Sequence, residues 1–133
     1  MDFDYEQFFT HHFIVKNKRE RLQFELLNES RRQRAISRFD HGAIKYIDKR
    51  KIIYSGNDIL WSDLKNLIEK NTDEQRCYVI SSDEEIDRTM IKVKDLFDCV
   101  IGLGRASIMV FTNMAIIETE QVQGPAMKYV LKL

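Results

Sequence analysis

The feature of this sequence that most limits its fold is a change of residue pattern near the middle of the chain. Up to about Lys70, apolar residues recur mostly at helical spacings of three and four. From Arg76 onward, β-branched runs alternate with turn-forming residues, which is typical of strands. Helices followed by strands favour an α+β fold over an alternating parallel one. We therefore predict a helical N-terminal half packed with a small, mostly antiparallel sheet of about four strands, formed largely by the C-terminal half.

No segment of the chain has the composition of a linker. The 133 residues include only five glycines and one proline, and 44% are hydrophobic. A globular chain of this length can bury about two-thirds of its unfolded surface. We therefore predict a single domain covering residues 1–133.

The composition also indicates the cellular compartment of the protein. No apolar run approaches the ~18 residues that cross a bilayer, and the N-terminus is acidic where a signal peptide begins basic. Two cysteines, Cys77 and Cys99, are too few for a disulfide framework in a chain this long. These features predict a cytoplasmic protein with free thiols and no membrane contact.

Two helices are expected at the start of the chain. The first covers residues 5–14, with Asp2 or Asp4 as its cap. Residues 17–20 form a capping-box pattern that predicts the start of the second helix. Its apolar residues surround most of the helix: Leu22, Phe24, Leu26 and Leu27. We therefore expect this helix to be central to the packing.

A third helix is expected from Arg31 to Asp40, with Ser30 as its cap. Helical spacing places Arg31, Arg34 and Arg38 within an arc of about 60° on one face. We call these three residues the arginine ridge. Apolar residues occupy another face of the same helix, so the ridge is predicted to face solvent.

Residues 43–47 and 51–54 are expected to form a hairpin, and residues 60–70 an amphipathic helix capped by the segment 55–58. Later strands are predicted at residues 77–80, 108–111, 115–117 and 129–131, with a turn at residues 112–113. Residues 82–85 resemble a capping box, which predicts a helix reaching Ile101. The competing interpretation is a loop from Asp83 to Met90 and a shorter helix near Val93, because residues 91–94 also alternate like a strand.

Charge is balanced overall but unevenly distributed. Residues 15–54 contain twelve basic and five acidic side chains, and the rest of the chain carries the compensating negative charge. This asymmetry indicates an acidic partner. The candidate partner-binding residues are Arg31, Arg34, Arg38, Arg32, Lys18 and Arg19.

Our first hypothesis is a non-enzymatic binding or regulatory protein that uses this basic helical surface. The partner would be an acidic protein or, as the less favoured case, nucleic acid, because arginine pairs with phosphate bidentately. The contrary interpretation is that Glu20, Glu25 and Glu29 pair with these cations within the molecule.

The alternative hypothesis is a small metal-dependent hydrolase or nuclease-like enzyme. Its metal would bind to carboxylates of the acidic cluster, which contains Asp83, Glu84, Glu85 and Asp87. An acidic first helical turn explains the same residues without any metal. His41 with Cys77 or Cys99 would form a nucleophile and base only if the fold brought them together.

No cofactor or metal site is predicted. The three histidines lack zinc spacing, and Gly102 and Gly104 follow a helix where a nucleotide loop follows a strand. The apolar C-terminal strand, residues 127–133, would also allow a homodimer if it formed an unprotected sheet edge.

Overall fold

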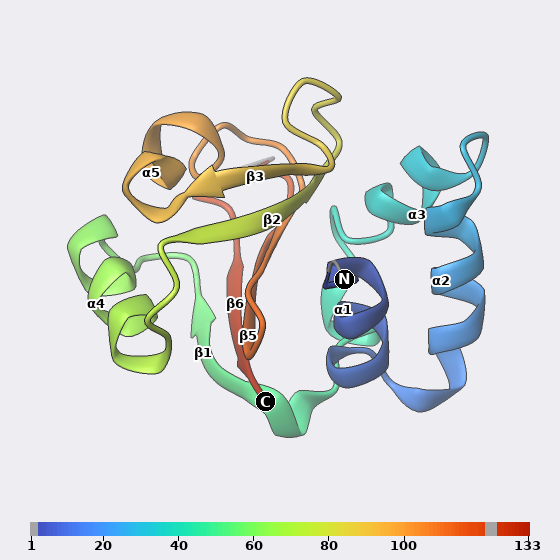
Figure 1. Ribbon diagram of the computed structural model, residues 1–133, viewed down its shortest axis with the longest axis horizontal. Helices are drawn as coiled ribbons and strands as arrows, with labels where there is room; N and C mark the ends of the chain where they lie inside the picture. The colour runs from blue at the N-terminus through green and yellow to red at the C-terminus, as the bar shows by residue number, and fades with distance from the viewer. Residues whose placement is uncertain (1–2, 122–124) are drawn as a thin grey trace.

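The computed structural model describes residues 3–121 and 125–133, which form a six-stranded sheet between two layers of helices (Figure 1). Every strand pairing within these residues is antiparallel. The α+β prediction is confirmed, although the sheet has more strands than the expected four. Across the sheet, the order is β1 (Ile52–Gly56), β6 (Lys128–Lys132), β5 (Met114–Glu118), β4 (Ser107–Val110), β2 (Arg76–Ser81) and β3 (Thr89–Lys92).

The helices divide between the two faces of the sheet (Figure 1). One face carries α1 (Tyr5–Phe13), α2 (Arg19–Leu27) and α3 (Arg32–Ser37), and the other carries α4 (Trp61–Asn71) and α5 (Leu96–Cys99). Short 3-10 turns lie at Lys16–Lys18, Ala43–Lys45, Lys49–Lys51 and Val93–Asp95. In the described part of the chain, no helix combines the length and apolar character needed to cross a bilayer.

Each face of the sheet has its own apolar core. The core under α1–α3 includes Phe9, Phe13 and Phe39, and the core under α4 and α5 includes Leu64 and Phe111. Strands β4 and β5 are buried on both faces. Burial on both sides explains why residues 108–110 and 114–117 are continuous apolar runs, with the polar Ser107 and Glu118 only at the strand ends.

Helix α2 lies outside α1 rather than at the centre of the packing. In Figure 1, α1 lies between α2 and the sheet. Helix α2 contacts α1 and α3, whereas α1 contacts β4. Leu22 and Leu26 are buried, but Phe24 and Leu27 are exposed. The expectation of a central helix is wrong because the apolar side chains form two stripes, and only one of them faces the core.

Of the expected helix caps, the first is confirmed and the later ones form differently; α4 begins after Leu60 with no side-chain cap, so the predicted cap at residues 55–58 is wrong. Asp4 accepts a hydrogen bond from the Gln7 amide and caps α1; Asp2 lies outside the described residues. The predicted capping box at residues 17–20 is wrong, because the preceding 3-10 turn continues directly into α2 and already bonds its first amides. Helix α3 begins at Arg32 and is shorter than expected, since Ser30 bonds to Asn28 in a turn.

The predicted hairpin of residues 43–54 is also wrong. Residues 43–45 form a 3-10 turn, and β1 pairs with β6 from the other end of the chain. Because β6 lies between β1 and β5, it has no free edge for the association that was expected of residues 127–133. The edges of the sheet are β1 and β3.

Between β2 and β3 the structure agrees with the loop interpretation, and the long helix to Ile101 is wrong. The chain turns through residues 83–88 and then forms the edge strand β3. Arg88 has a φ of 65°, which a right-handed helix does not allow. The short helix α5 follows after a 3-10 turn that begins at Val93.

Candidate functional site

Arg32 is buried, although the sequence places it among the partner-binding residues. Its side chain is only 4% exposed. The guanidinium group donates to both carboxylate oxygens of Glu6, to both of Asp87 and to the Leu26 carbonyl, at 2.7–2.9 Å. These bonds use all the N–H groups of an arginine side chain. Arg32 is therefore unable to contact a partner directly, which removes it from the candidate surface.

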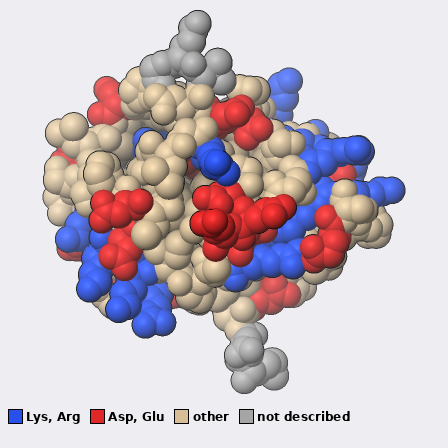
Figure 2. Space-filling view, turned by 90° about the horizontal axis from the view of Figure 1, so that it is seen from above, with Lys and Arg blue, Asp and Glu red and all other residues tan. Residues whose placement is uncertain are grey.

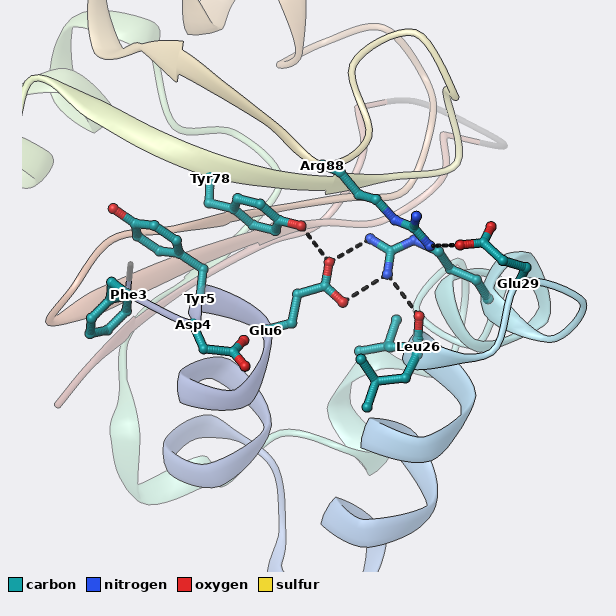
Figure 3. Close-up of a pocket in the computed structure, with 10 residues that line it drawn as sticks. Phe3, Asp4, Tyr5, Glu6, Leu26, Glu29, Tyr78 and Arg88 are labelled. Carbon is teal, nitrogen blue, oxygen red and sulfur yellow. Dashed lines mark hydrogen bonds and ion pairs between the residues drawn. The ribbon is translucent and has the colours of Figure 1, made fainter. Parts of the chain in front are cut away.

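The groups around Arg32 form a buried polar cluster, defined here as Glu6, Arg32, Tyr78 and Asp87. The Tyr78 hydroxyl donates to Glu6 at 2.6 Å (Figure 3), and the Ser81 amide donates to Asp87 at 3.0 Å. Burial, followed by the hydrogen bond to Glu6, raises the pKa of Tyr78. The cluster joins α1, α3, β2 and the β2–β3 loop, so its role is to hold the helical layer on the sheet.

Arg38 is also paired inside the molecule. Both of its terminal nitrogens donate to the buried carboxylate of Glu25, and the Nη2–Oε2 distance is 2.8 Å. The hydrogen bond from Arg38 lowers the pKa of Glu25 against the opposing effect of burial. One of the three ridge residues is therefore neutralised by a glutamate, as the contrary interpretation of the sequence requires.

We expect Glu25→Gln to lower the free energy of unfolding by about 1–3 kcal/mol at pH 7, since a charge-assisted hydrogen bond is lost. Because the folded state lowers the pKa of Glu25, its contribution exists above the unfolded pKa near 4.5 and disappears as the pH falls through the folded value. Urea unfolding at several pH values should therefore show the two proteins converging below about pH 4.5. Glu20→Gln, an exposed change on the same helix, should have little effect at any pH; equal effects would contradict this assignment.

The other two ridge residues, Arg31 and Arg34, remain exposed. The Arg31 guanidinium lies 5.7 Å from the centre of the Phe24 ring, within the range of a cation–π contact. Lys18 lies 4.7 Å above the Tyr46 ring, and Arg19 donates to the Ile14 carbonyl at 2.8 Å. The predicted basic surface is thus divided between residues held by the protein and residues open to solvent.

Two functional candidates were missed by the sequence prediction. Phe24 and Leu27 are 56% and 71% exposed, next to Arg31 and three residues apart on the outer side of α2. The signal was present in the spacing, because Leu22, Glu25 and Leu26 form the inward stripe and leave Phe24 and Leu27 outside it. The α2–α3 face is defined here as Arg21, Phe24, Leu27, Arg31 and Arg34.

Basic side chains also gather in space. Figure 2 shows blue side chains on the side of the molecule where α2 and α3 lie, next to a red group nearer the centre of this view, and a second blue group at the lower left. At the start of α2, a hollow of about 290 Å³ is lined by Lys18, Arg21, Arg38 and Tyr46. Arg38 is already paired with Glu25, so Lys18 and Arg21 are the cations of this hollow that favour the binding of an anionic group.

The acidic cluster does not converge on one point. Asp87 turns inward to Arg32, Asp83 accepts from the Glu85 amide, and Glu84 and Glu85 are exposed. Within residues 3–121 and 125–133, no group of three or more His, Cys, Asp or Glu side chains is arranged to hold a metal ion. The geometry therefore offers no support for the metal-dependent enzyme.

His41 and the cysteines lie in different surroundings. His41 is 3.3 Å from Glu120 and lines a hollow in which the described residues include no cysteine. Cys77 is buried in β2, and burial raises its pKa to about 12. Cys99 is exposed on α5. A nucleophile paired with His41 is therefore not formed by either thiol.

Comparisons of this chain with protein-family models, curated proteins and solved structures find no match. The fold and the site define a class in structural terms only. The chain is an antiparallel α+β protein with an exposed helical face that is both apolar and basic.

Proposed function

We propose that the protein is a non-enzymatic binding protein whose α2–α3 face recognises an acidic segment of a partner protein. The observation that carries this proposal is the exposure of Phe24 and Leu27 among arginines of the same face. Exposing large apolar side chains to water is unfavourable, and burying them in an interface stabilises a complex. Aromatic residues and arginine are also the types enriched at protein interfaces.

Charge determines the kind of partner. Arg21, Arg31 and Arg34 are exposed on this face, and the hollow at the start of α2 adds Lys18. A partner with carboxylates would complement these cations and would be steered toward them. An acidic protein is favoured over nucleic acid, because Arg32 and Arg38 are paired internally and an aliphatic side chain, Leu27, is exposed on the face.

The test uses fluorescence anisotropy with three labelled probes. The first is a Glu/Asp-rich peptide with interspersed Leu and Phe, the second has Lys in place of its acidic residues, and the third is an oligothymidylate. We expect the acidic peptide to bind most tightly. The double variant Arg31→Glu, Arg34→Glu should weaken its binding by about 10- to 100-fold, because attraction becomes repulsion. Phe24→Ala with Leu27→Ala should weaken it similarly.

The matched control is Lys65→Glu with Lys70→Glu, which makes the same charge change at exposed positions of α4. This control should change the affinity less than about threefold. An equal loss of affinity in the arginine and lysine double variants would show a nonspecific charge effect and overturn the proposal. Tighter binding of the oligothymidylate, with a steep dependence on salt, would favour nucleic acid instead.

A further inference from the structure

A cavity of about 500 Å³ lies at the end of α2, between that helix, the start of α1 and strand β2 (Figure 3). Its apolar walls come from Phe3, Tyr5, Leu26 and Leu27. The Tyr5 ring stacks on Tyr78 with the ring centres 5.3 Å apart, and Phe3 meets Tyr5 edge-on at 4.7 Å. Leu27 belongs both to this cavity and to the α2–α3 face, so the two are continuous.

Most polar groups in this cavity already have partners. Glu6 accepts hydrogen bonds from both Arg32 and Tyr78, and Asp4 caps α1. Arg88 is different: in the described part of the chain, its guanidinium makes one ion pair, with Glu29 at 2.7 Å. Glu29 is 79% exposed, so the pair faces water and exchanges readily. Arg88 therefore keeps unused N–H groups at the rim of an apolar cavity.

The backbone holds Arg88 at this rim. Its φ of 65° is the only positive value at a non-glycine residue within residues 3–121 and 125–133. The preceding residue, Asp87, is fixed by Arg32, and the Arg88 amide donates to the Val79 carbonyl at 2.7 Å. A non-glycine residue kept in this unfavourable backbone conformation requires support from its surroundings, and such residues concentrate at ligand-binding sites.

From these contacts we infer that the cavity binds an apolar side chain of the partner that stands next to a carboxylate. The apolar group packs against Phe3, Tyr5 and Leu27, and the carboxylate pairs with Arg88. In the free protein, Glu29 occupies the place of that carboxylate. This inference rests on the proposed function, because it specifies which feature of an acidic partner segment is recognised.

A cationic ligand and a carboxylate ligand should respond in opposite ways to changes at Arg88 and Glu29. If the cavity instead accepted a cation, the ligand would displace Arg88 from Glu29 and pair with Glu29 itself. Removing Arg88 would then strengthen binding, and neutralising Glu29 would weaken it. For a carboxylate ligand, removing Arg88 should weaken binding and neutralising Glu29 should strengthen it, since Arg88 is the binding group and Glu29 is its competitor.

The experiment is an NMR titration of the full chain with phenylacetate, benzylamine and phenylacetamide, which share a ring and differ in charge. Phenylacetate is expected to bind most tightly and to shift the signals of Tyr5 and Tyr78. Arg88→Gly should weaken its binding about tenfold; glycine accepts the positive φ, so the variant keeps the local backbone. Arg88→Lys should retain part of the affinity, and Glu29→Gln should raise it about threefold by removing the competitor.

The control variants are Arg76→Gln and Glu85→Gln, which change the same charges at exposed positions outside the cavity lining. Both should leave phenylacetate binding within about twofold of wild type. Tighter binding of benzylamine, or an unchanged affinity in Arg88→Gly, would overturn the inference. So would the absence of any shift at Tyr5 and Tyr78.

Failure of the cavity and failure of the proposed function give different results. Suppose the acidic peptide binds, and its affinity falls in the Arg31→Glu, Arg34→Glu variant but is unchanged in Arg88→Gly and Glu29→Gln. The proposed role of the α2–α3 face is then supported, and the proposed role of the cavity is rejected. If phenylacetate binds at Arg88 while no acidic peptide binds to the protein, the cavity is a small-molecule site and the proposed partner recognition is excluded.

Discussion

Arg32→Met is expected to lower the free energy of unfolding by about 3–5 kcal/mol at pH 7. The substitution preserves an apolar stem but leaves the carboxylates of Glu6 and Asp87 without the cation that binds both. Burying a charge without its partner is strongly unfavourable, and here two carboxylates lose the same one. The loss should exceed that of any surface arginine, because Arg32 joins three parts of the fold.

Urea unfolding followed by the fluorescence of Trp61 and by circular dichroism measures this effect. Arg34→Met, an exposed change on the same helix, should cost less than about 0.5 kcal/mol. Neutralising the carboxylates as well, in the triple variant with Glu6→Gln and Asp87→Asn, should recover part of the loss. A cost for Arg32→Met no larger than that for Arg34→Met would mean that the cluster does not hold the layers together.

Lys128→Met is expected to cost about 3–5 kcal/mol at pH 7 for a related reason. The Lys128 ammonium lies 3.2 Å from Glu118, whose side chain is fully buried in β5. The Gly102 amide also donates one bifurcated hydrogen bond to both carboxylate oxygens of Glu118, at 3.0 and 3.2 Å. This hydrogen bond remains in the variant, but the Lys128 cation is lost and the carboxylate stays buried.

The pH dependence of this variant follows from the pKa of Glu118. Burial raises that pKa, and Lys128 opposes the increase. A carboxyl group whose pKa is raised in the folded state adds stability that is complete below the unfolded pKa and is lost as the pH rises through the folded one. Without Lys128 this loss of stability should be larger. The difference in the free energy of unfolding between the variant and wild type should therefore be largest near neutral pH and smallest below about pH 4.5.

The measurement is chemical unfolding of both proteins between acidic and neutral pH. Adding Glu118→Gln to Lys128→Met should remove most of the extra pH dependence, because the buried group no longer ionises. If the cost of Lys128→Met is instead the same at every pH, it arises from lost packing of the lysine stem rather than from the charge on Glu118.

The internal ion pairs of Arg32 and Arg38 explain why the charge asymmetry of the sequence overstates the basic surface. Arg32 and Arg38 were counted as partner-binding residues, yet they neutralise Glu6, Asp87 and Glu25 within the molecule. Arg31 and Arg34 belong to the same short segment and remain exposed. Residues one or two positions apart therefore have opposite roles, structural inside the fold and available for recognition outside it.

By itself, the sequence determined the fold class and most of its regular elements. The amphipathic spacing of α4 and the apolar runs of β2, β4, β5 and β6 are local properties, and each element formed near its predicted place. The turn at residues 112–113 joins β4 to β5 as expected. These predictions succeeded because periodicity and turn chemistry depend on neighbours along the chain.

Only the tertiary structure decided which arginines are internal, where β1 and β3 pair, and which stripe of α2 faces solvent. Arg32 meets Glu6 and Asp87 at sequence separations of 26 and 55 residues. No local pattern records such a contact, since a charge can be buried only where the fold brings a distant counter-charge to it. The exposure of Phe24 and Leu27 has the same origin, because it depends on α1 occupying the space between α2 and the sheet.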